Sequence, residues 1–526
     1  MRVAPPNSRE SWSRIDYDVY ERMEETVMGD EADQTRRWLI NASGAAILSS
    51  TLPATGPSAQ AAPAPTPGAA AHAAGEPTSS AAATLADYVA KTPDRDLPAE
   101  VVARVKLHVL DTFAAIVSGS RLKAGELAAR YVDSQGGKPQ AMVIGTGIVT
   151  TAVNAAFANA MSAHADETDD TNPVGPVHLG CSALPAALAT GELTGRNGTD
   201  LLRAVTLGYD IGARFVSALG VGQGPHRRSP SVLTSTFIAA MSAAAMLRLD
   251  PRQVRHTLSY AAQQASGIGF WTRDHEHVEK AFDFAGMGAR NGVMAATMVA
   301  MGFSAVDDPF AGRENIYTAL ADNPAPEKLL AELGTSYAVF GTTIKKWSVG
   351  APLQAVLDAT ATLLNEPGVR ADNIKHIRVD MPSDSLRIVD NSTIPDLCLQ
   401  HLVALMIVDR GARFAAVHDV TRMSDPTVLA VRKLVELAGS EELQNAQPAR
   451  QAIVRIDTAD GRTLSHHTVV VRGTARNPME ASEVEAKAFD LMAPVLGAAR
   501  AKEVIAAVAN LERIDAVSDL RRLLQA

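Results

Sequence analysis

The feature that most constrains the fold is a helical repeat of apolar residues that runs through most of the chain after Pro98. Apolar side chains recur there at steps of three and four residues, which places them on one face of a helix. The first such stretch contains Val102, Val105, Val109, Phe113 and Ile116. The same spacing predicts helices over residues 200–219, 233–248, 251–266, 286–301 and 353–365. The sequence therefore predicts a mainly α-helical fold.

The periodicity changes after about Phe340. Ile377, Val379 and Met381 alternate with polar residues, which is typical of a strand, and segments 452–458 and 463–472 flank the turn pair Asp460-Gly461. Helical spacing returns from about Glu480. We therefore expect a large helical domain over residues 82–340 and 480–526, interrupted by an inserted, smaller α/β domain over residues 341–479.

Charge and cysteine content exclude some classes of protein. The formal net charge is −9, whereas nucleic-acid binders usually show a basic excess, so no nucleic-acid partner is expected. The only two cysteines, Cys181 and Cys398, lack metal-ligand spacing and cannot form a disulfide framework. We expect two buried free thiols.

Residues 1–81 differ in composition from the rest of the chain. Arg36-Arg37 precedes a short apolar stretch and the small-residue site Ala59-Gln60-Ala61, a pattern that resembles a twin-arginine export signal. We expect export to the periplasm with cleavage near Ala62, the alternative being a disordered leader on a cytoplasmic protein. The apolar stretch is too short to span a bilayer, so no membrane insertion is expected.

The segment from Ala163 to His178 concentrates polar residues between two apolar helices. It contains His164, Asp166, Glu167, Asp169, Asp170, Thr171 and His178. A solvated loop and a metal site are the alternatives to a catalytic loop, because carboxylates and imidazoles are usable ligands. No EF-hand or H-E-x-x-H spacing is present, so no metal is expected. A second polar cluster, Asp274-His275-Glu276-His277, has an H-x-H pattern that can bind metal. We expect a solvated loop there instead, one that borders the site because it precedes Lys280.

The run Ala163–Thr171 resembles the signature of the MmgE/PrpD family, the 2-methylcitrate dehydratases and cis-aconitate decarboxylases. Further similar segments are residues 184–189, 198–212, 262–270 and 289–292, and the resemblance extends over residues 82–526. It implies a homodimer with a large helical domain and a smaller lid domain. It also implies tricarboxylate substrates and no metal or organic cofactor.

The resemblance implies roles for particular side chains. His178 would be the general acid/base, while Lys280 and Lys345 would hold substrate carboxylates, with Lys345 rather than Lys346 facing the site. A tricarboxylate carries about three negative charges and therefore needs cationic partners, and proton transfer near neutral pH favours histidine. The implied substrate-binding residues are Glu167, Asp170, Thr171, His226, Arg228 and Ser229.

The sequence departs from the family pattern at one catalytic position. The family's second histidine aligns with Ser229, so the acid/base set is incomplete unless His226 contributes. The leading hypothesis is a lyase that dehydrates 2-methylcitrate, a reaction of propionate metabolism, or acts on a related small polycarboxylate. An isomerase or epimerase on the same scaffold and a non-catalytic carboxylate binder are the alternatives.

Overall fold

The computed structural model of the protein describes residues 80–222 and 228–526, and most of these residues are helical. The first part of the chain contains the α-helices α2 (Ser80–Ala90), α3 (Ala99–Gly119), α4 (Lys123–Gln135), α5 (Ala152–Ala163), α6 (Gly180–Thr194), α7 (Gly198–Leu219), α8 (Pro230–Met246), α9 (Pro251–Gln264), α10 (Val278–Ala281), α11 (Met287–Ala300), α12 (Ile316–Leu320) and α13 (Ala338–Gly341). Two short antiparallel strands, β1 (Ala141–Met142) and β2 (Val149–Thr150), lie between α4 and α5. The prediction of a mainly helical fold is confirmed.

Helices α8 and α11 form the centre of this part, and α6 and α7 pack against α8. Small residues bring the helices close together. A Cβ atom on Gly292 of α11 would lie 2.5 Å from the backbone nitrogen of Ala240 in α8, and one on Gly208 of α7 would lie 2.3 Å from Ser242 Oγ. Both distances are shorter than any van der Waals contact, so glycine is required for these crossings.

A four-stranded sheet follows, in the order β4-β3-β5-β6. Its strands are β3 (Ile374–Pro382), β4 (Val435–Ser440), β5 (Ala452–Thr458) and β6 (Thr463–Thr468). Strand β4 is parallel to β3, whereas β5 and β6 are antiparallel neighbours. The helices of this region are α14 (Gln354–Leu363), α15 (Ser383–Val389), α16 (Leu399–Asp409), α17 (Phe414–Val417), α18 (Pro426–Arg432) and α19 (Glu441–Gln444).

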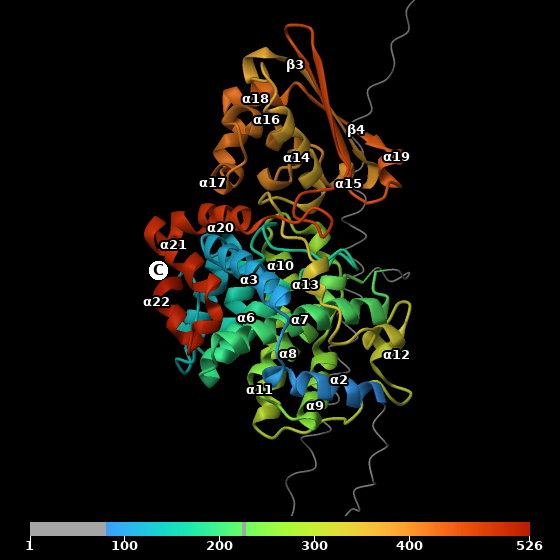
Figure 1. Ribbon diagram of the computed structural model, residues 1–526, viewed down its shortest axis with the longest axis vertical. Helices are drawn as coiled ribbons and strands as arrows, with labels where there is room; N and C mark the ends of the chain where they lie inside the picture. The colour runs from blue at the N-terminus through green and yellow to red at the C-terminus, as the bar shows by residue number, and fades with distance from the viewer. Residues whose placement is uncertain (1–79, 223–227) are drawn as a thin grey trace, which may run out of the picture. The chain divides into compact units, whose positions relative to one another are not determined.

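The last helices return to the first part of the chain. They are α20 (Ala481–Leu496), α21 (Ala498–Ala509) and α22 (Arg521–Leu524), and Figure 1 shows them in red beside the blue α3. One hydrophobic core joins side chains from Ala82 to Ile344 with others from Met479 to Leu524, and a second core contains Val349 to Ile456. The two segments that connect these cores touch each other. A Cβ on Gly473 in one segment would lie 1.9 Å from the carbonyl oxygen of Ile344 in the other.

The predicted helices and strands correspond to observed elements, although several of their ends differ by a few residues. Strand β6 ends at Thr468 rather than at residue 472, because Arg472 turns away to donate to Asp358 and Glu483. Strand β4 was not predicted, because its residues Val435–Ser440 are half-buried or exposed and do not alternate with buried positions. Cys181 and Cys398 are buried free thiols, as expected.

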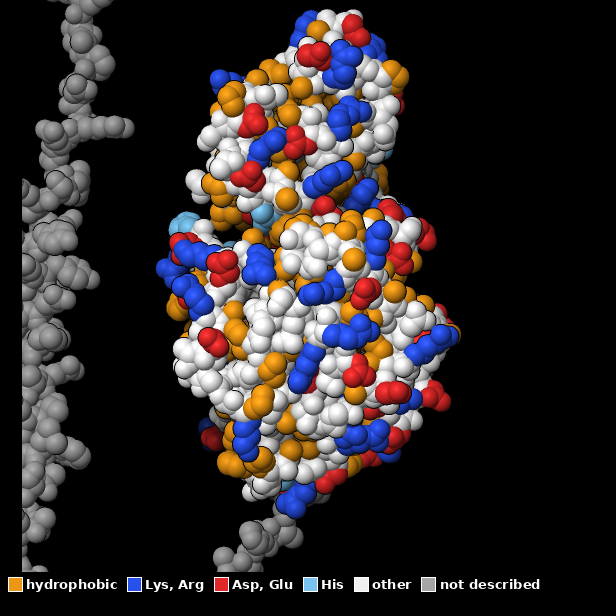
Figure 2. Space-filling view, turned by 90° about the vertical axis from the view of Figure 1, so that its left-hand side faces the viewer, with side chains coloured by type: hydrophobic (Ala, Val, Ile, Leu, Met, Phe, Trp, Pro, Cys, Tyr) orange, Lys and Arg blue, Asp and Glu red, His pale blue; other side chains and the backbone are white. Residues whose placement is uncertain are grey.

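Other expectations concern the surface and the leader. The export signal and the cleavage site near Ala62 lie outside the described residues. None of the described helices is both long and apolar enough to cross a membrane. On the face drawn in Figure 2, basic and acidic side chains are interspersed rather than gathered into a basic stripe.

The close crossing of α8 and α11 gives a stability prediction. We expect Gly292→Val to destabilise the protein by about 1–3 kcal/mol, the usual cost of overpacking, because the new side chain would overlap Ala239 and Ala240. Thermal unfolding followed by circular dichroism should show a melting temperature several degrees lower. Gly147→Val is the control, since a Cβ there meets no atom within 4 Å. Equal melting temperatures for both variants and the wild type would contradict the packing argument.

Candidate functional site

The polar loop that joins α5 to α6 lies inside the protein. The carboxylates of Asp166, Glu167, Asp169 and Asp170 belong to residues that are at most 6% exposed, so the alternative of a solvated loop is wrong. Asp166 shapes the turn by accepting hydrogen bonds from the backbone nitrogen and the hydroxyl of Thr168 (2.9 and 2.6 Å). Buried charges are costly unless they are paired, and each of these acids has a partner.

Asp169 lies between two imidazoles. Its Oδ1 accepts from Nδ1 of His178 and its Oδ2 accepts from Nδ1 of His164, both at 3.0 Å. Burial alone would raise the pKa of Asp169, but the two histidines hold it well below its usual range. Burial lowers the pKa of His164 to about 4, despite the neighbouring Asp169. Asp169 is therefore ionised, and it orients His178 so that Nε2 is the ring nitrogen left for other contacts.

An irregular helical turn packs against these imidazoles. Residues Phe282–Gly286 form a π-helical turn between α10 and α11, a feature that often occurs at functional sites. Its Phe284 ring stacks on His164, with centroids 4.8 Å apart, and meets His178 edge-on at 5.5 Å. Trp271 packs on the same phenylalanine at 5.1 Å. The imidazoles thus have an apolar wall on one side.

Glu167 pairs with basic side chains from distant parts of the chain. It contacts Lys280 Nζ through Oε1, which is also 3.2 Å from Nε2 of His277, and its Oε2 lies 3.7 Å from Lys345 Nζ. Burial alone would raise the pKa of Glu167, but Lys280, His277 and Lys345 hold it well below its usual range. The expectation that residues 274–277 form a solvated loop is wrong for His277, which is 9% exposed.

The chain places Lys345, and not Lys346, in the site. Backbone hydrogen bonds between Thr171 and Thr343 (3.1 and 2.8 Å) fix the register of this segment against the loop. Lys345 Nζ, which is 1% exposed, donates to the carbonyl oxygen of Glu167 at 2.6 Å and lies 3.9 Å from Asp169 Oδ1. Lys346 lies instead over the ring of Trp347, 4.8 Å from its centroid.

The sheet-containing region contributes residues that were not predicted from the sequence. Nε2 of His418, at the end of α17, lies 2.8 Å from Asp166 Oδ2. The buried Asp396 interacts electrostatically with His418, and burial raises the pKa of this carboxyl. Arg450 interacts electrostatically with Glu167. These residues lie about 230–280 positions after the loop, and no motif links them to it, so no sequence pattern predicts the contact.

Asp170 is in the loop but faces away from the other site residues. Its carboxylate accepts from Nδ1 of His108 (2.9 Å), from the hydroxyl of Tyr209 and from the backbone nitrogen of Gly180 (3.1 Å). The side chain is completely buried. Contrary to the substrate-binding role implied by the resemblance, Asp170 anchors the loop to α3, α6 and α7.

The other residues that were predicted to bind substrate are Thr171, Arg228, Ser229 and His226. Thr171 is 8% exposed, and its backbone pairs with Thr343. Arg228 donates to the carbonyl oxygen of Leu320 at 2.6 Å and lies 3.6 Å from Asp322. Ser229 precedes α8, which begins close to the loop because the backbone nitrogen of His178 donates to Ser231 Oγ (3.2 Å). His226 lies outside the described residues.

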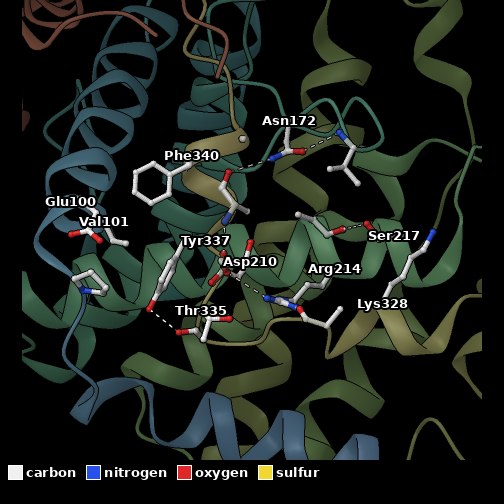
Figure 3. Close-up of a pocket in the computed structure, with 18 residues that line it drawn as sticks. Glu100, Val101, Asn172, Asp210, Arg214, Ser217, Lys328, Thr335, Tyr337 and Phe340 are labelled. Atoms are coloured by element: carbon white, nitrogen blue, oxygen red, sulfur yellow. Dashed lines mark hydrogen bonds between the residues drawn. The ribbon is translucent and has the colours of Figure 1, made fainter. Parts of the chain in front are cut away.

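The cavity in Figure 3 is a different place from this cluster. It has a volume of about 990 Å³, and Asn172 and Val174 are the only residues of the loop that line it. Asp210 accepts from the backbone nitrogen of Ala338 at 2.7 Å, and Arg214 donates to the carbonyl oxygens of Ala331 and Glu332. These two α7 side chains hold the segment that leads into Lys345, so the cavity wall supports the site without forming it.

The structure also brings together a set of ligand types that sequence spacing did not predict. Within the described residues, nitrogen and oxygen atoms of His164, Asp169 and His178 lie within 4.8 Å of one another, a separation compatible with a metal ion. Both Nδ1 atoms already share the Asp169 carboxylate through hydrogen bonds. These hydrogen bonds account for the arrangement as a triad in which Asp169 orients two imidazoles.

Comparisons with known proteins identify the family of the chain. Residues 83–329 match the MmgE/PrpD N-terminal domain, and residues 347–513 match the MmgE/PrpD C-terminal domain. A cis-aconitate decarboxylase from Aspergillus terreus is 24% identical over 469 residues, covering 82% of this chain and 92% of the relative. A cis-aconitate decarboxylase-like protein, oryM, from Aspergillus oryzae is 26% identical over 283 residues, covering 50% of this chain and 57% of the relative.

The pair formed by His418 and Asp166 gives a pH prediction. Burial alone would lower the pKa of His418, but the adjacent carboxylate of Asp166, together with Asp396, raises it to about 9. Because the folded pKa exceeds the unfolded value of about 6.5, the stabilisation is complete below about pH 6.5 and is lost as the pH rises through 9. The pKa of Asp166 is lowered, so the pair also weakens in acid.

We therefore expect His418→Gln to lower the melting temperature most between about pH 5 and 6.5, and least above pH 9. Melting curves of wild type and variant at matched pH values test this. His376→Gln is the control, because His376 pairs with Glu436 on an exposed part of the sheet, where both side chains are more than 40% exposed. A His418→Gln effect that does not change with pH would refute the ion pair.

Proposed function

Because the chain belongs to the MmgE/PrpD family, we propose that it is a lyase that acts on a small tricarboxylate. We further propose cis-aconitate decarboxylation as the reaction, with dehydration of 2-methylcitrate, a step of propionate metabolism, as the competing one. The relatives named as cis-aconitate decarboxylases support the first choice. The single observation that carries the proposal is the cluster in which His178, oriented by Asp169, lies beside the cations that surround Glu167.

The cluster contains the chemical groups that such a substrate needs. Lys280 Nζ and Lys345 Nζ reach the same carboxylate of Glu167 from α10 and from the segment after α13. A substrate carboxylate could bind the same two lysines, either in place of Glu167 or together with it. His178 is oriented through Nδ1, so Nε2 is available to transfer a proton.

The two reactions make different demands on acids and bases. In the decarboxylation, the bond to one carboxylate breaks and CO₂ leaves. The electron pair forms a new C=C bond, the neighbouring double bond shifts, and the far carbon takes one proton from an acid. Dehydration needs a base that removes a C–H proton and an acid that protonates the departing hydroxyl. One oriented histidine, with Ser229 where the family has its second, suits the reaction that needs a single proton donor.

The proposed reaction uses no organic cofactor, because the side chains of His178, Lys280 and Lys345 supply the proton and the positive charge. CO₂ loss leaves electron density on the substrate carbon framework, and cations beside the remaining carboxylates stabilise it. Lys280 and Lys345 supply that charge inside a site walled by Phe284 and Trp271. Each step of the proposed reaction is therefore assigned to side chains of this protein.

We also propose a homodimer, in keeping with the resemblance. Exposed apolar side chains occur around α11 and in nearby segments, where they would be covered by a second copy. They are Ile268 (56% exposed), Phe270 (47%), Met294 (36%), Met301 (87%), Phe303 (53%) and Val306 (63%). Clusters of this kind commonly mark protein interfaces.

The first functional prediction concerns His178. We expect the wild type to release CO₂ from cis-aconitate, and His178→Gln to lower the turnover number by about 10²-fold or more, the scale of general acid catalysis. The variant should keep a near wild-type melting temperature, because the ring is at the edge of the buried cluster. The assay follows CO₂ and product by mass spectrometry. Water loss from 2-methylcitrate without CO₂ release from cis-aconitate would favour dehydration, and unchanged turnover would remove His178 from the mechanism.

The second functional prediction compares two adjacent lysines. Lys345→Met should raise the apparent Michaelis constant by roughly ten- to a hundredfold, the loss expected for one charge-assisted hydrogen bond, because Lys345 Nζ is buried beside Glu167 and Asp169. Lys346→Met is the matched control and should change it little, because Lys346 lies over Trp347. Steady-state kinetics of both variants decides, and equal effects would show that substrate does not meet Lys345.

A further inference from the structure

We propose that His277 binds one carboxylate of the substrate and takes up a proton as it does so. It would then be an anion-binding group that is positively charged only in the complex. This inference rests on the proposed function and adds a residue to the same site. His277 directly precedes α10, three positions before Lys280, and the family resemblance implied no role for it.

His277 reaches the site through direct contacts. Its Nε2 lies 3.2 Å from Oε1 of Glu167, the oxygen that also contacts Lys280 Nζ. Its ring centroid is 5.3 Å from that of His164, and the residue is 9% exposed. This imidazole is therefore part of the buried cluster that would hold the substrate.

The two ring nitrogens of His277 have different surroundings. Burial alone would raise the pKa of Glu167, but its basic neighbours hold it well below its usual range, so this carboxylate is ionised and only accepts hydrogen bonds. Nε2 therefore carries the proton that it donates to Glu167. Nδ1 is buried and has no hydrogen-bond partner among residues 80–222 and 228–526. Buried polar atoms normally have one, and a substrate carboxylate would provide it once Nδ1 is protonated.

The charges of the cluster are balanced before an anion binds. Lys280 and Lys345 lie beside two ionised acids, Glu167 and Asp169. Burial lowers the pKa of His164 to about 4, so this imidazole is neutral near pH 7. A tricarboxylate adds about three negative charges, and buried charge is costly unless it is paired. Imidazole is the side chain that gains a positive charge most readily near neutral pH.

The other titratable groups around His277 also favour a positive imidazole. Asp274 in the same loop and Asp396 from the sheet-containing region both interact electrostatically with His277. Lys280 opposes the charge, but it is paired with Glu167. Two carboxyl groups besides Glu167 would thus stabilise the protonated ring.

The loop holds His277 in a defined position. Its φ angle is +57°, in the left-handed region that residues other than glycine rarely adopt and that often occurs at functional sites. The carboxylate of Asp274 accepts hydrogen bonds from the backbone nitrogens of Glu276 (2.9 Å) and Lys280 (2.8 Å), on either side of His277. The ring is therefore presented to Glu167 by a turn that the loop itself stabilises.

The test measures proton uptake when propane-1,2,3-tricarboxylate binds, a saturated analogue that has no double bond to rearrange. Isothermal calorimetry of the full chain, in buffers with different enthalpies of ionisation, gives the number of protons taken up for each ligand bound. At about pH 7.5, carboxyl groups with ordinary pKa values near 4 are already ionised. The wild type should take up a proton on binding, and its dissociation constant should increase from about pH 7 to pH 8.5, as the imidazole becomes harder to protonate.

The variant His277→Gln separates charge from hydrogen bonding, because its amide can donate to Glu167 but cannot become charged. It should lose at least half of the proton uptake and bind the analogue about tenfold more weakly at pH 7. The matched control is His275→Gln, which changes an exposed histidine of the same loop and should bind like the wild type. With cis-aconitate, His277→Gln should raise the Michaelis constant about tenfold, while the turnover number stays within about threefold.

The outcomes separate this assignment from the proposed function. Binding by the wild type without proton uptake, or unchanged uptake in His277→Gln, would overturn the assignment and leave the proposed function standing. An equal loss in His275→Gln would overturn it too. Failure of the wild type to bind the analogue and to turn over cis-aconitate would instead remove the proposed function, and the inference with it. Should His277→Gln not fold, His277→Asn carries the same comparison.

Discussion

The structure depends on the burial of an ionised acidic loop. Asp166, Glu167 and Asp169 lie almost out of contact with water, and the free energy of such an arrangement is acceptable only when opposite charges lie close by. Those charges come from α10, from the segment after α13 and from α17. Parts of the chain that are far apart in sequence thus contact the loop. Their ion pairs with its carboxylates favour one arrangement of those parts.

This dependence links stability to function in a particular way. The lysines that neutralise Glu167 in the free protein are the same ones that would hold a substrate carboxylate. A bound anion would therefore compete with Glu167 for Lys280 and Lys345. Further from the site, Lys487 of α20 donates to Asp111 of α3 (2.6 Å) and to the carbonyl oxygen of Thr168 (3.1 Å). Helix α20 thereby holds the loop through its backbone.

The sequence predicts this protein well where a local pattern carries the information. The helical periodicity of α3, α7 and α8 and the alternation of β3 and β5 are local, and the site lysine at 345 follows from a motif. His277 and His418 were missed because their roles depend on contacts with residues 110 and about 250 positions away, Glu167 and Asp166. Asp170 was assigned to substrate because a polar motif does not reveal which of its side chains turn inward to Tyr209 and His108. Strand β4 was missed because its pairing with β3, rather than its own composition, makes it a strand.

The contact between Gly473 and the carbonyl oxygen of Ile344 has a meaning for natural variation in this protein. The residue that follows Ile344 is Lys345, whose segment pairs with the loop through the backbone hydrogen bonds between Thr171 and Thr343 and whose Nζ donates to the carbonyl oxygen of Glu167. Any side chain at position 473 would press on that carbonyl and displace the lysine, although the two positions are separated by more than a hundred residues. In a collection of variant sequences, a substitution at 473 would look remote and conservative. Its consequence would nevertheless be that of a change in the site itself, so this glycine belongs with the functional residues when inherited or selected changes are interpreted.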